Sequence, residues 1–191
     1  MRVIGVDPGS RATGWGVIER AGNKLHGIDA GVIRANVKAE LHTRICTIYQ
    51  SLNEIMSRYE PEVLAIEDVF FAPRYAQAAL QLGHARGVVM LAAAERGMPV
   101  HSYAPAVVKR AIAGHGRAEK PQVARMVQSI LGWKKITQTD TTDALAIALT
   151  HLSTFIACAV SSTELQTRPK SKTSLSATVR KQHSLPRYHL E

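Results

Sequence analysis

Val3-Ile4-Gly5-Val6-Asp7-Pro8-Gly9-Ser10 places a carboxylate directly after a short apolar run and before two residues that interrupt regular structure. The apolar residues are typical of a buried strand, and a charge at the end of such a strand is costly unless something compensates it. Glu67 ends a second apolar run, Val63-Leu64-Ala65-Ile66, in the same way. If the two runs are neighbouring parallel strands, the two carboxylates lie side by side and repel each other unless one is protonated or a cation bridges them.

Two further acids, Asp140 and Asp143, stand three residues apart at the start of a helix predicted over residues 140 to 157, which Thr139 could cap. This spacing puts both carboxylates on one helix face. Asp7, Asp140 and Asp143 each have a plainer interpretation alone, because Asp-Pro-Gly forms turns and acids are common in the first turn of a helix. Glu67 is harder to explain in this way, because it lies inside an apolar segment. The four together indicate Mg²⁺ or Mn²⁺, and two such ions about 3.5 to 4 Å apart can carry phosphodiester hydrolysis.

The rest of the chain predicts an α/β domain that begins with three strands, of which the last two are close enough in the sequence to form an antiparallel hairpin. Helices and strands then alternate, and residues beyond about 160 have the composition of a disordered tail. We therefore divide the chain into a domain over residues 1 to 157 and a basic tail over residues 158 to 191. The predicted strands are 3 to 7, 12 to 20, 25 to 34, 63 to 70 and 100 to 103, and the predicted helices are 41 to 60, 76 to 96, a short one from Pro105, 121 to 131 and 140 to 157.

Composition narrows the class of protein. The 191 residues carry a net charge of +9, of which residues 161 to 191 contribute +4 through six Lys or Arg and two Glu. Such a basic surface attracts polyanions, most commonly nucleic acid, although it also aids solubility. Cys46 and Cys158 lack the spacing of a zinc site, and no apolar run reaches the roughly 18 residues of a membrane helix. A cytoplasmic protein without membrane insertion is expected.

Five motifs in this order resemble the RuvC family of bacterial crossover-junction endodeoxyribonucleases. They extend from residue 1 to about residue 155, and each is weak alone whereas the ordered set is highly specific. The resemblance implies an RNase H-like fold with a five-stranded mixed sheet flanked by helices. The motifs are Asp7-Pro8-Gly9-Ser10-Arg11 with Thr13-Gly14-Trp15-Gly16, Ala65-Ile66-Glu67-Asp68-Val69-Phe70, Leu82-Gly83-His84-Ala85-Arg86-Gly87, Ala118-Glu119-Lys120 and Asp140-Thr141-Thr142-Asp143-Ala144-Leu145-Ala146.

The resemblance also implies a reaction and a set of site residues. Asp7, Glu67, Asp140 and Asp143 would be the catalytic and metal-binding acids, with Mg²⁺ as cofactor, Mn²⁺ as a substitute and two ions per site. The reaction would be hydrolysis of one phosphodiester on each of two opposed strands of a four-way (Holliday) junction, in DNA recombination and repair. Asp140 stands where some members have histidine, and Asp68 stands where a glutamine is familiar, so its part in metal binding is open.

Several residues are candidates for contact with DNA. By resemblance Lys109 and Lys120 match lysines that contact DNA or assist cleavage, and Phe70 matches an aromatic that stacks on an unpaired base. The Gly-rich segment 114 to 118, with Arg117, can approach phosphate closely. Ser10 and Arg11 directly follow the first acid, and Arg74 is a weaker candidate. Any one of these lysines taken alone is more often a solvated surface charge, and an aromatic residue beyond a strand end more often belongs to the core.

Paired nicks need two active sites, which a homodimer supplies. The family is dimeric, and the helix predicted over residues 76 to 96 is a candidate interface because Ala79, Gly83, Gly87 and Met90 lie near one face. Ordinary packing on the sheet is the alternative for this helix. The resemblance also implies the RuvA–RuvB branch-migration complex as a partner. A nuclease of the same fold that processes ribosomal RNA precursor is the second candidate function.

Overall fold

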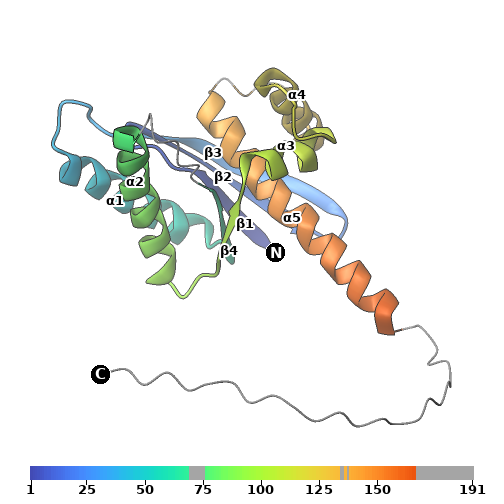
Figure 1. Cartoon of the computed structure of the whole chain (residues 1–191). Coiled ribbons are helices and arrows are strands. Elements are labelled where there is room, and N and C mark those ends of the chain that lie inside the picture. The colour runs from blue at the N-terminus through green and yellow to red at the C-terminus, as the bar shows by residue number, and fades with distance from the viewer. Residues whose placement is uncertain (69–75, 134–135, 137, 167–191) are drawn as a thin grey trace, which may run out of the picture.

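A computed structural model describes residues 1 to 68, 76 to 133, 136 and 138 to 166, with side chains as far as residue 154. Five strands form one mixed sheet in the order β3-β2-β1-β4-β5 (Figure 1). β2 runs antiparallel to both β1 and β3, whereas β4 runs parallel to β1 and β5 parallel to β4. The predicted five-stranded mixed sheet is confirmed. The strands are Arg2–Asp7 (β1), Ala12–Ala21 (β2), Lys24–Arg34 (β3), Val63–Glu67 (β4) and Val100–Tyr103 (β5).

The helices follow the predicted order. They are Leu41–Tyr59 (α1), Ala76–Ala94 (α2), Pro105–Ala113 (α3), Lys120–Leu131 (α4) and Thr139–Gln166 (α5). In the described part of the chain, no helix is both long and apolar enough to cross a membrane.

Several predicted boundaries were wrong, most importantly those of β4 and α5. β4 ends at Glu67 rather than at residue 70, and residues 69 to 75 lie outside the described residues. α5 begins at Thr139, so this residue is already helical and does not precede the helix as a cap. α5 also continues to Gln166, past the predicted end at residue 157, because extending a packed helix costs far less than starting one. The predicted tail beyond residue 166 lies outside the described residues.

Both faces of the sheet are buried, each by its own group of helices. Val3, Val63 and Ala65 pack with α3, α4 and α5, whereas Ile4 and Ile66 pack with α1 and α2 on the opposite face. Figure 1 shows α5 crossing one face of the sheet and the α1–α2 pair on the other side. Because side chains alternate along a strand, the position of each residue in β1 or β4 decides which helices it meets.

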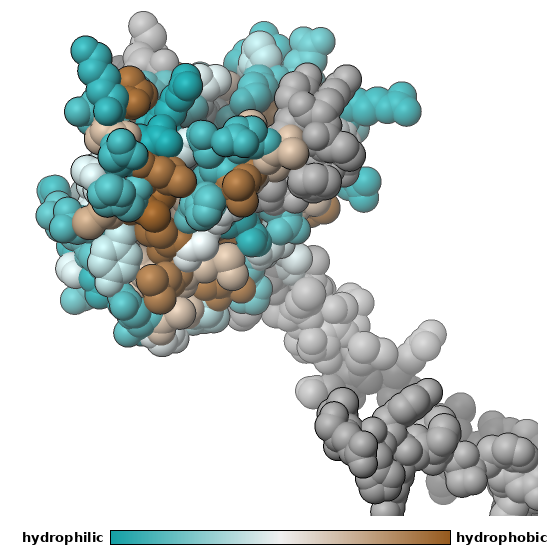
Figure 2. Space-filling model, turned by 60° about the vertical axis from the view of Figure 1, so that its left-hand side comes forward, coloured by the Kyte–Doolittle hydropathy of each residue, from teal (hydrophilic) through white to brown (hydrophobic). Residues whose placement is uncertain are grey.

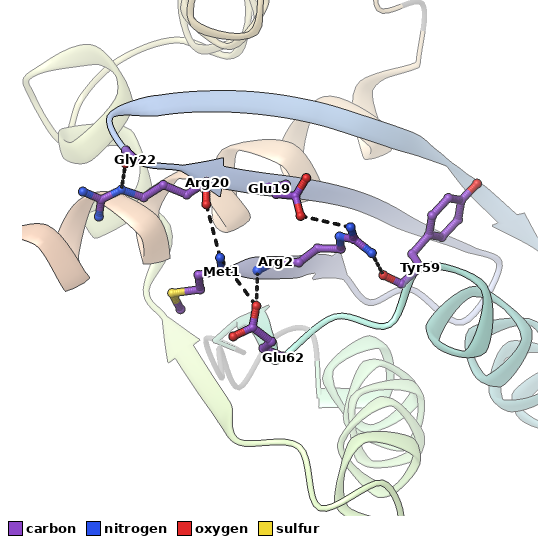
Figure 3. A network of polar contacts seen from close by, with 7 residues as sticks. All are labelled: Met1, Arg2, Glu19, Arg20, Gly22, Tyr59 and Glu62. Atoms are coloured by element: carbon purple, nitrogen blue, oxygen red, sulfur yellow. Dashed lines mark hydrogen bonds and ion pairs between the residues drawn. The ribbon is translucent and has the colours of Figure 1, made fainter.

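Hydrogen bonds and ion pairs stabilise the N-terminal end of β1 (Figure 3). The backbone N–H of Arg2 donates to Glu62 Oε1 at 2.8 Å, and the Arg2 guanidinium donates to Glu19 Oε1 at 3.0 Å and to the carbonyl of Tyr59. The terminal ammonium of Met1 donates to the carbonyl of Arg20 at 3.2 Å. These contacts join β1 to β2 and to the connection before β4, at the end of the strand opposite to Asp7.

Candidate active site

The alternation of side chains in the two central strands sends two of the predicted acids to one face of the sheet. Asp7 follows Val3 and Gly5 at intervals of two, and Glu67 follows Val63 and Ala65 likewise. Because Val3, Val63 and Ala65 belong to the core that α5 covers, Asp7 and Glu67 end on the α5 side. Asp68, one residue on, falls on the opposite face, toward α2.

The parallel pairing of β1 with β4 sets these two acids beside each other. Val6 is in register with Ile66, so that the next residues, Asp7 and Glu67, are neighbours at the carboxyl ends of both strands. The loop after Asp7 is held by Thr13, whose buried hydroxyl donates to the carbonyl of Gly9 at 2.9 Å and accepts from its N–H at 3.3 Å. The predicted juxtaposition of Asp7 and Glu67 is confirmed.

Glycines in β1 and β2 allow α5 to lie directly on the backbone of the sheet. A Cβ on Gly5 would lie 2.1 Å from the carbonyl oxygen of Ala144, and one on Gly14 would lie 2.0 Å from that of Asp140. Gly16, the register partner of Gly5, likewise faces Leu145. No larger residue fits at these positions. The close approach brings the first two turns of α5, with Asp140 and Asp143, to the end of β1.

A cavity of about 340 Å³ opens where these elements meet. Three of the four predicted acids line it, together with two predicted lysines: Asp7, Glu67, Asp143, Lys109 from α3 and Lys120 from α4. The remaining wall is mostly apolar: Pro105, Val108, Val123, Ala146 and Ile147. Asp140 is absent from this lining but is close enough to Asp7 to raise its pKa. The carboxylates therefore share one hollow, with Asp140 at its margin.

Burial and the neighbouring acids perturb the ionisation of Asp7 and Glu67. Burial, followed by repulsion from Glu67, Asp143 and Asp140, raises the pKa of Asp7 to about 7. Burial and Asp143 also raise the pKa of Glu67, although a hydrogen bond with Asp7 and the charges of Lys120 and Lys109 oppose that rise. Neutral Asp7 can donate a proton to Glu67, so the pair behaves as two carboxyls sharing a proton.

Lys120 is the basic residue in closest contact with the acids. Its ammonium donates to Asp143 Oδ2 at 2.8 Å, and this hydrogen bond is the main cause of its raised pKa. Lys120 also lowers the pKa of Asp7 and of Glu67. The side chain of Lys120 is 66% exposed and that of Asp143 only 25% exposed, so the ammonium covers the carboxylate from the solvent side.

The carboxylates of the cavity suit a divalent cation that takes its other ligands from water and substrate. Crowded carboxylate oxygens with raised pKa values are the hard ligands that Mg²⁺ and Mn²⁺ prefer, and a cation would relieve their repulsion. Among the described residues, however, no three His, Cys, Asp or Glu side chains are gathered closely enough to enclose an ion. Mg²⁺ characteristically uses one or two carboxylates with water and substrate phosphate, so an open set suits substrate-assisted binding.

The predicted DNA-contacting residues lie in different parts of the structure. Lys109 and Lys120 line the cavity with the acids. Ser10 donates to Gln81 Oε1 of α2 at 3.5 Å, whereas Arg11 and Arg117 are exposed. Phe70 and Arg74 lie outside the described residues.

Sequence reasoning did not anticipate three features of the site. These are the close glycine contacts beneath α5, the bond between Thr13 and the Gly9 loop, and the side chain of Arg86, which reaches the end of β4. The glycines left a visible signal, because Gly5, Gly14 and Gly16 interrupt strands at alternate positions, which is typical of close backbone approach. Arg86 stood inside a recognised motif, but its spacing gave no indication of its contacts.

Comparisons with known proteins agree with this architecture. The family model of "Crossover junction endodeoxyribonuclease RuvC" matches residues 3–151. A protein of that name from Citrifermentans bemidjiense is 46% identical over 151 residues, which are 79% of this chain and 92% of that relative. One from Geobacter sulfurreducens is 44% identical over 156 residues, which are 82% of this chain and 94% of that relative.

Solved structures give the same result. The Thermus thermophilus RuvC structure has a TM-score of 0.75 at 39% identity, covering 83% of this chain and 97% of its own. The T. thermophilus RuvC in complex with Holliday junction substrate reaches 0.78 at 38% identity, covering 83% of this chain and 96% of its own. The yeast mitochondrial Holliday junction resolvase Ydc2, at 12% identity and a TM-score of 0.58 over 79% of this chain and 78% of its own, shares the fold. On these matches the chain belongs to the crossover junction endodeoxyribonuclease RuvC family, a family of hydrolases that depend on a divalent metal.

Proposed function

We propose that this protein is a structure-selective endonuclease that resolves four-way DNA junctions by two symmetric nicks. The observation that carries the proposal is the cavity in which Asp7, Glu67 and Asp143 meet Lys109 and Lys120 at the carboxyl ends of β1 and β4. Clustered acids suit phosphodiester hydrolysis, and lysines beside them suit a polyanionic substrate. The T. thermophilus relative, which is 38% identical, has been solved with Holliday junction substrate.

The four acids would hold Mg²⁺, or Mn²⁺ in its place, with two ions per site. When bound, these ions supply a nucleophile at neutral pH and neutralise charge on the scissile phosphate and the leaving 3′-oxygen. Asp7 and Glu67 lie at the ends of adjacent strands and are fixed by the sheet, so they provide the rigid half of the site. Asp140 and Asp143 come from the first two turns of α5, which the glycine contacts hold in place.

Lys109 and Lys120 have a different task from the acids. Their ammonium groups face the carboxylates from α3 and α4 and lower the pKa of Glu67. They favour the ionised form of Glu67 for metal binding and neutralise a phosphate that enters the cavity. Release of Asp143 by Lys120 would accompany binding of a cation at that carboxylate, because both compete for Oδ2.

The remaining DNA contacts are assigned by sequence position. Arg11 and Arg117 are exposed on the rim and are available to DNA phosphates, and Ser10 lies next to Arg11 in the loop that follows Asp7. Phe70 follows Glu67 by three residues, where an aromatic side chain can stack on an unpaired base at the junction centre. Arg74 is a further candidate for a phosphate contact.

A homodimer would supply the second active site, and α2 offers a face for it. Ala85, Val89, Ala92 and Ala93 are buried against the rest of the domain. Gly83 and Gly87 point the other way, since a Cβ at either position would have no heavy atom within 4 Å. Large apolar side chains are exposed on the same helix: Leu80, Met90 and Leu91. The buried face fits packing of α2 within the domain, and the open face supports the proposed interface.

The neighbouring surface strengthens the case for association through α2. His42, Ile45, Cys46 and Tyr49 of α1 border a hollow of about 300 Å³ with Val88 and Leu91 of α2. Figure 2, which brings the left-hand side of Figure 1 forward, shows apolar surface on this side of the molecule bordered by hydrophilic residues. Exposed apolar patches of this kind mark sites of protein association.

The proposed setting follows from the substrate. Junctions in chromosomal DNA form during recombination and repair, so we place the protein in the bacterial cytoplasm, with the RuvA–RuvB branch-migration complex as its partner. The family match favours this function over processing of ribosomal RNA precursor, the second candidate.

Substrate selectivity tests the proposal. The full chain with Mg²⁺ should cut a synthetic four-way DNA junction into two nicked duplexes with 5′-phosphate ends, while a linear duplex of the same sequence and a structured RNA stay intact. Cleavage of the RNA in preference to the junction would support the second candidate and contradict the first. Equal cutting of junction and linear duplex would contradict structure selectivity.

A further inference from the structure

Arg86, in the middle of α2, makes several polar contacts around the ends of β4 and β5. Its Nε donates to the carbonyl of Glu67 at 3.3 Å, and its Nη2 donates to Asp68 Oδ1 at 3.1 Å and to Ser102 Oγ at 2.7 Å. Its Nη1 lies 3.4 Å from Met90 Sδ. One side chain therefore joins α2 to the ends of both β4 and β5.

The geometry follows from the alternation of side chains at the end of the sheet. Glu67 points to the α5 side, whereas Asp68 and Ser102 fall on the α2 side with Ile66, the register partner of Ser102. Asp68 also keeps its backbone in the ladder, because its N–H donates to the carbonyl of Tyr103 at 2.9 Å. The peptide between Glu67 and Asp68 is thus held from β5 through its N–H and from α2 through its carbonyl.

We propose that Arg86 is a positioning residue for Glu67, and that Asp68 serves as the anchor of Arg86 and binds no metal. The proposal rests on the proposed function, since it concerns the geometry of the same cavity. Fixing the peptide that follows the Glu67 Cα fixes the direction in which the Glu67 carboxylate enters the site. Groups that orient metal ligands in this way typically contribute 10- to 100-fold to metal affinity or activity.

Only an arginine satisfies all of these contacts at once. The planar guanidinium donates in three directions from a rigid fork, whereas a lysine has a single flexible ammonium. The side chain of Arg86 is 21% exposed and that of Asp68 is 52% exposed, so the ion pair alone is worth little in water. Its effect lies in holding the guanidinium over the Glu67 carbonyl.

The test compares Arg86→Ala with Arg96→Ala. Arg96 lies beyond the C-terminal end of α2 and also bridges elements, through Nη2 to the carbonyl of Asn53 at 2.8 Å and to Ser57 Oγ at 2.7 Å, but it does not touch the site. For each variant we would measure Tm, the dissociation constant for a four-way junction in Ca²⁺, the single-turnover cleavage rate and the Mg²⁺ concentration at half-maximal rate.

Arg86→Ala should lower the cleavage rate, or raise the half-maximal Mg²⁺ concentration, by about 10- to 100-fold while changing junction affinity by less than about threefold. Arg86→Lys should recover only part of the loss, and Arg96→Ala should change neither the rate nor the Mg²⁺ requirement. Asp68→Ala should have a smaller effect than Arg86→Ala and none when Arg86 is already alanine, because the two act as one unit.

Two results would overturn the proposal while the wild type still cuts junctions. One is an unchanged rate and Mg²⁺ requirement in Arg86→Ala. The other is a rise in the Mg²⁺ requirement on adding Asp68→Ala to Arg86→Ala, which would make Asp68 a metal ligand. If Arg86→Ala does not fold, the cleavage rate and the Mg²⁺ requirement of Arg86→Lys are the test. Wild-type values of both in Arg86→Lys would contradict the proposal. A wild type that fails to cut junctions contradicts the proposed function instead.

Discussion

Lys120 Nζ lies 2.8 Å from Asp143 Oδ2, and this ion pair joins the start of α4 to the second turn of α5 inside the cavity that Asp7 and Glu67 also line. The pair brings a positive charge to a cluster in which burial and mutual repulsion favour protonation. Removal of the ammonium therefore has two consequences, one for the ionisation of the acids and one for the binding of phosphate.

Lys120→Ala should reduce single-turnover cleavage by about tenfold or more, since the loss of one charge-assisted contact and of its effect on Asp7 both act on the reaction. In this variant the pKa of Asp7 should be higher. Cleavage rates measured from pH 6 to 9 should therefore rise at a higher pH than in the wild type. Arg125→Ala, which removes an exposed charge from the same helix, is the matched control. A pH profile identical to that of the wild type would contradict the assigned role of Lys120.

Metal-free protein should lose stability as the pH rises from about 4 to about 7. The pKa of Asp7 is raised in the folded state, so the folded protein binds a proton more tightly than the unfolded chain and loses that advantage on deprotonation. Glu67 contributes with the same sign. Asp7→Asn should therefore raise the Tm at pH 7.5 by roughly 4 to 8 °C and leave it nearly unchanged at pH 4. A lower Tm at pH 7.5 in this variant would contradict the assignment.

Gly5→Ala should destabilise the fold by about 2 kcal/mol or more and abolish cleavage, because its Cβ would meet the carbonyl of Ala144 at 2.1 Å and displace α5. Ser129→Ala offers a control on α4, where the side chain is exposed and alanine favours the helix. Urea denaturation of both variants measures the difference. Equal stabilities would show that α5 does not depend on close contact with β1.

Gly87→Gln should convert a dimer to a monomer without lowering the stability of the fold. The position is helical and open to solvent, so the larger side chain fits the monomer but separates two apposed α2 helices. Sedimentation equilibrium gives the association state, and cleavage products on a junction should change from paired to single nicks. A variant that stays dimeric would place the interface elsewhere.

The order of strands and helices along the chain could be predicted, and so could the meeting of Asp7 with Glu67 if the two apolar runs were neighbouring parallel strands, because parallel strands bring such ends together. For Asp143, only its position on a helix could be predicted. Its place in the cavity depends on contacts between Gly5, Gly14 and the α5 backbone. The network of Arg86 was not predictable, because it joins three segments that are far apart in the sequence. The end of α5 was missed because helix propagation outweighs local composition.

The central claim is that the acids at the ends of β1 and β4 carry metal-dependent cleavage of junctions. Its most direct test is single-turnover cleavage of a four-way junction in Mg²⁺ by the wild type and by Asp7→Asn, with junction affinity measured in parallel. We predict that the variant binds the junction as tightly as the wild type within about threefold and that its cleavage falls by at least about a thousandfold. Cleavage by Asp7→Asn at the wild-type rate would contradict the account.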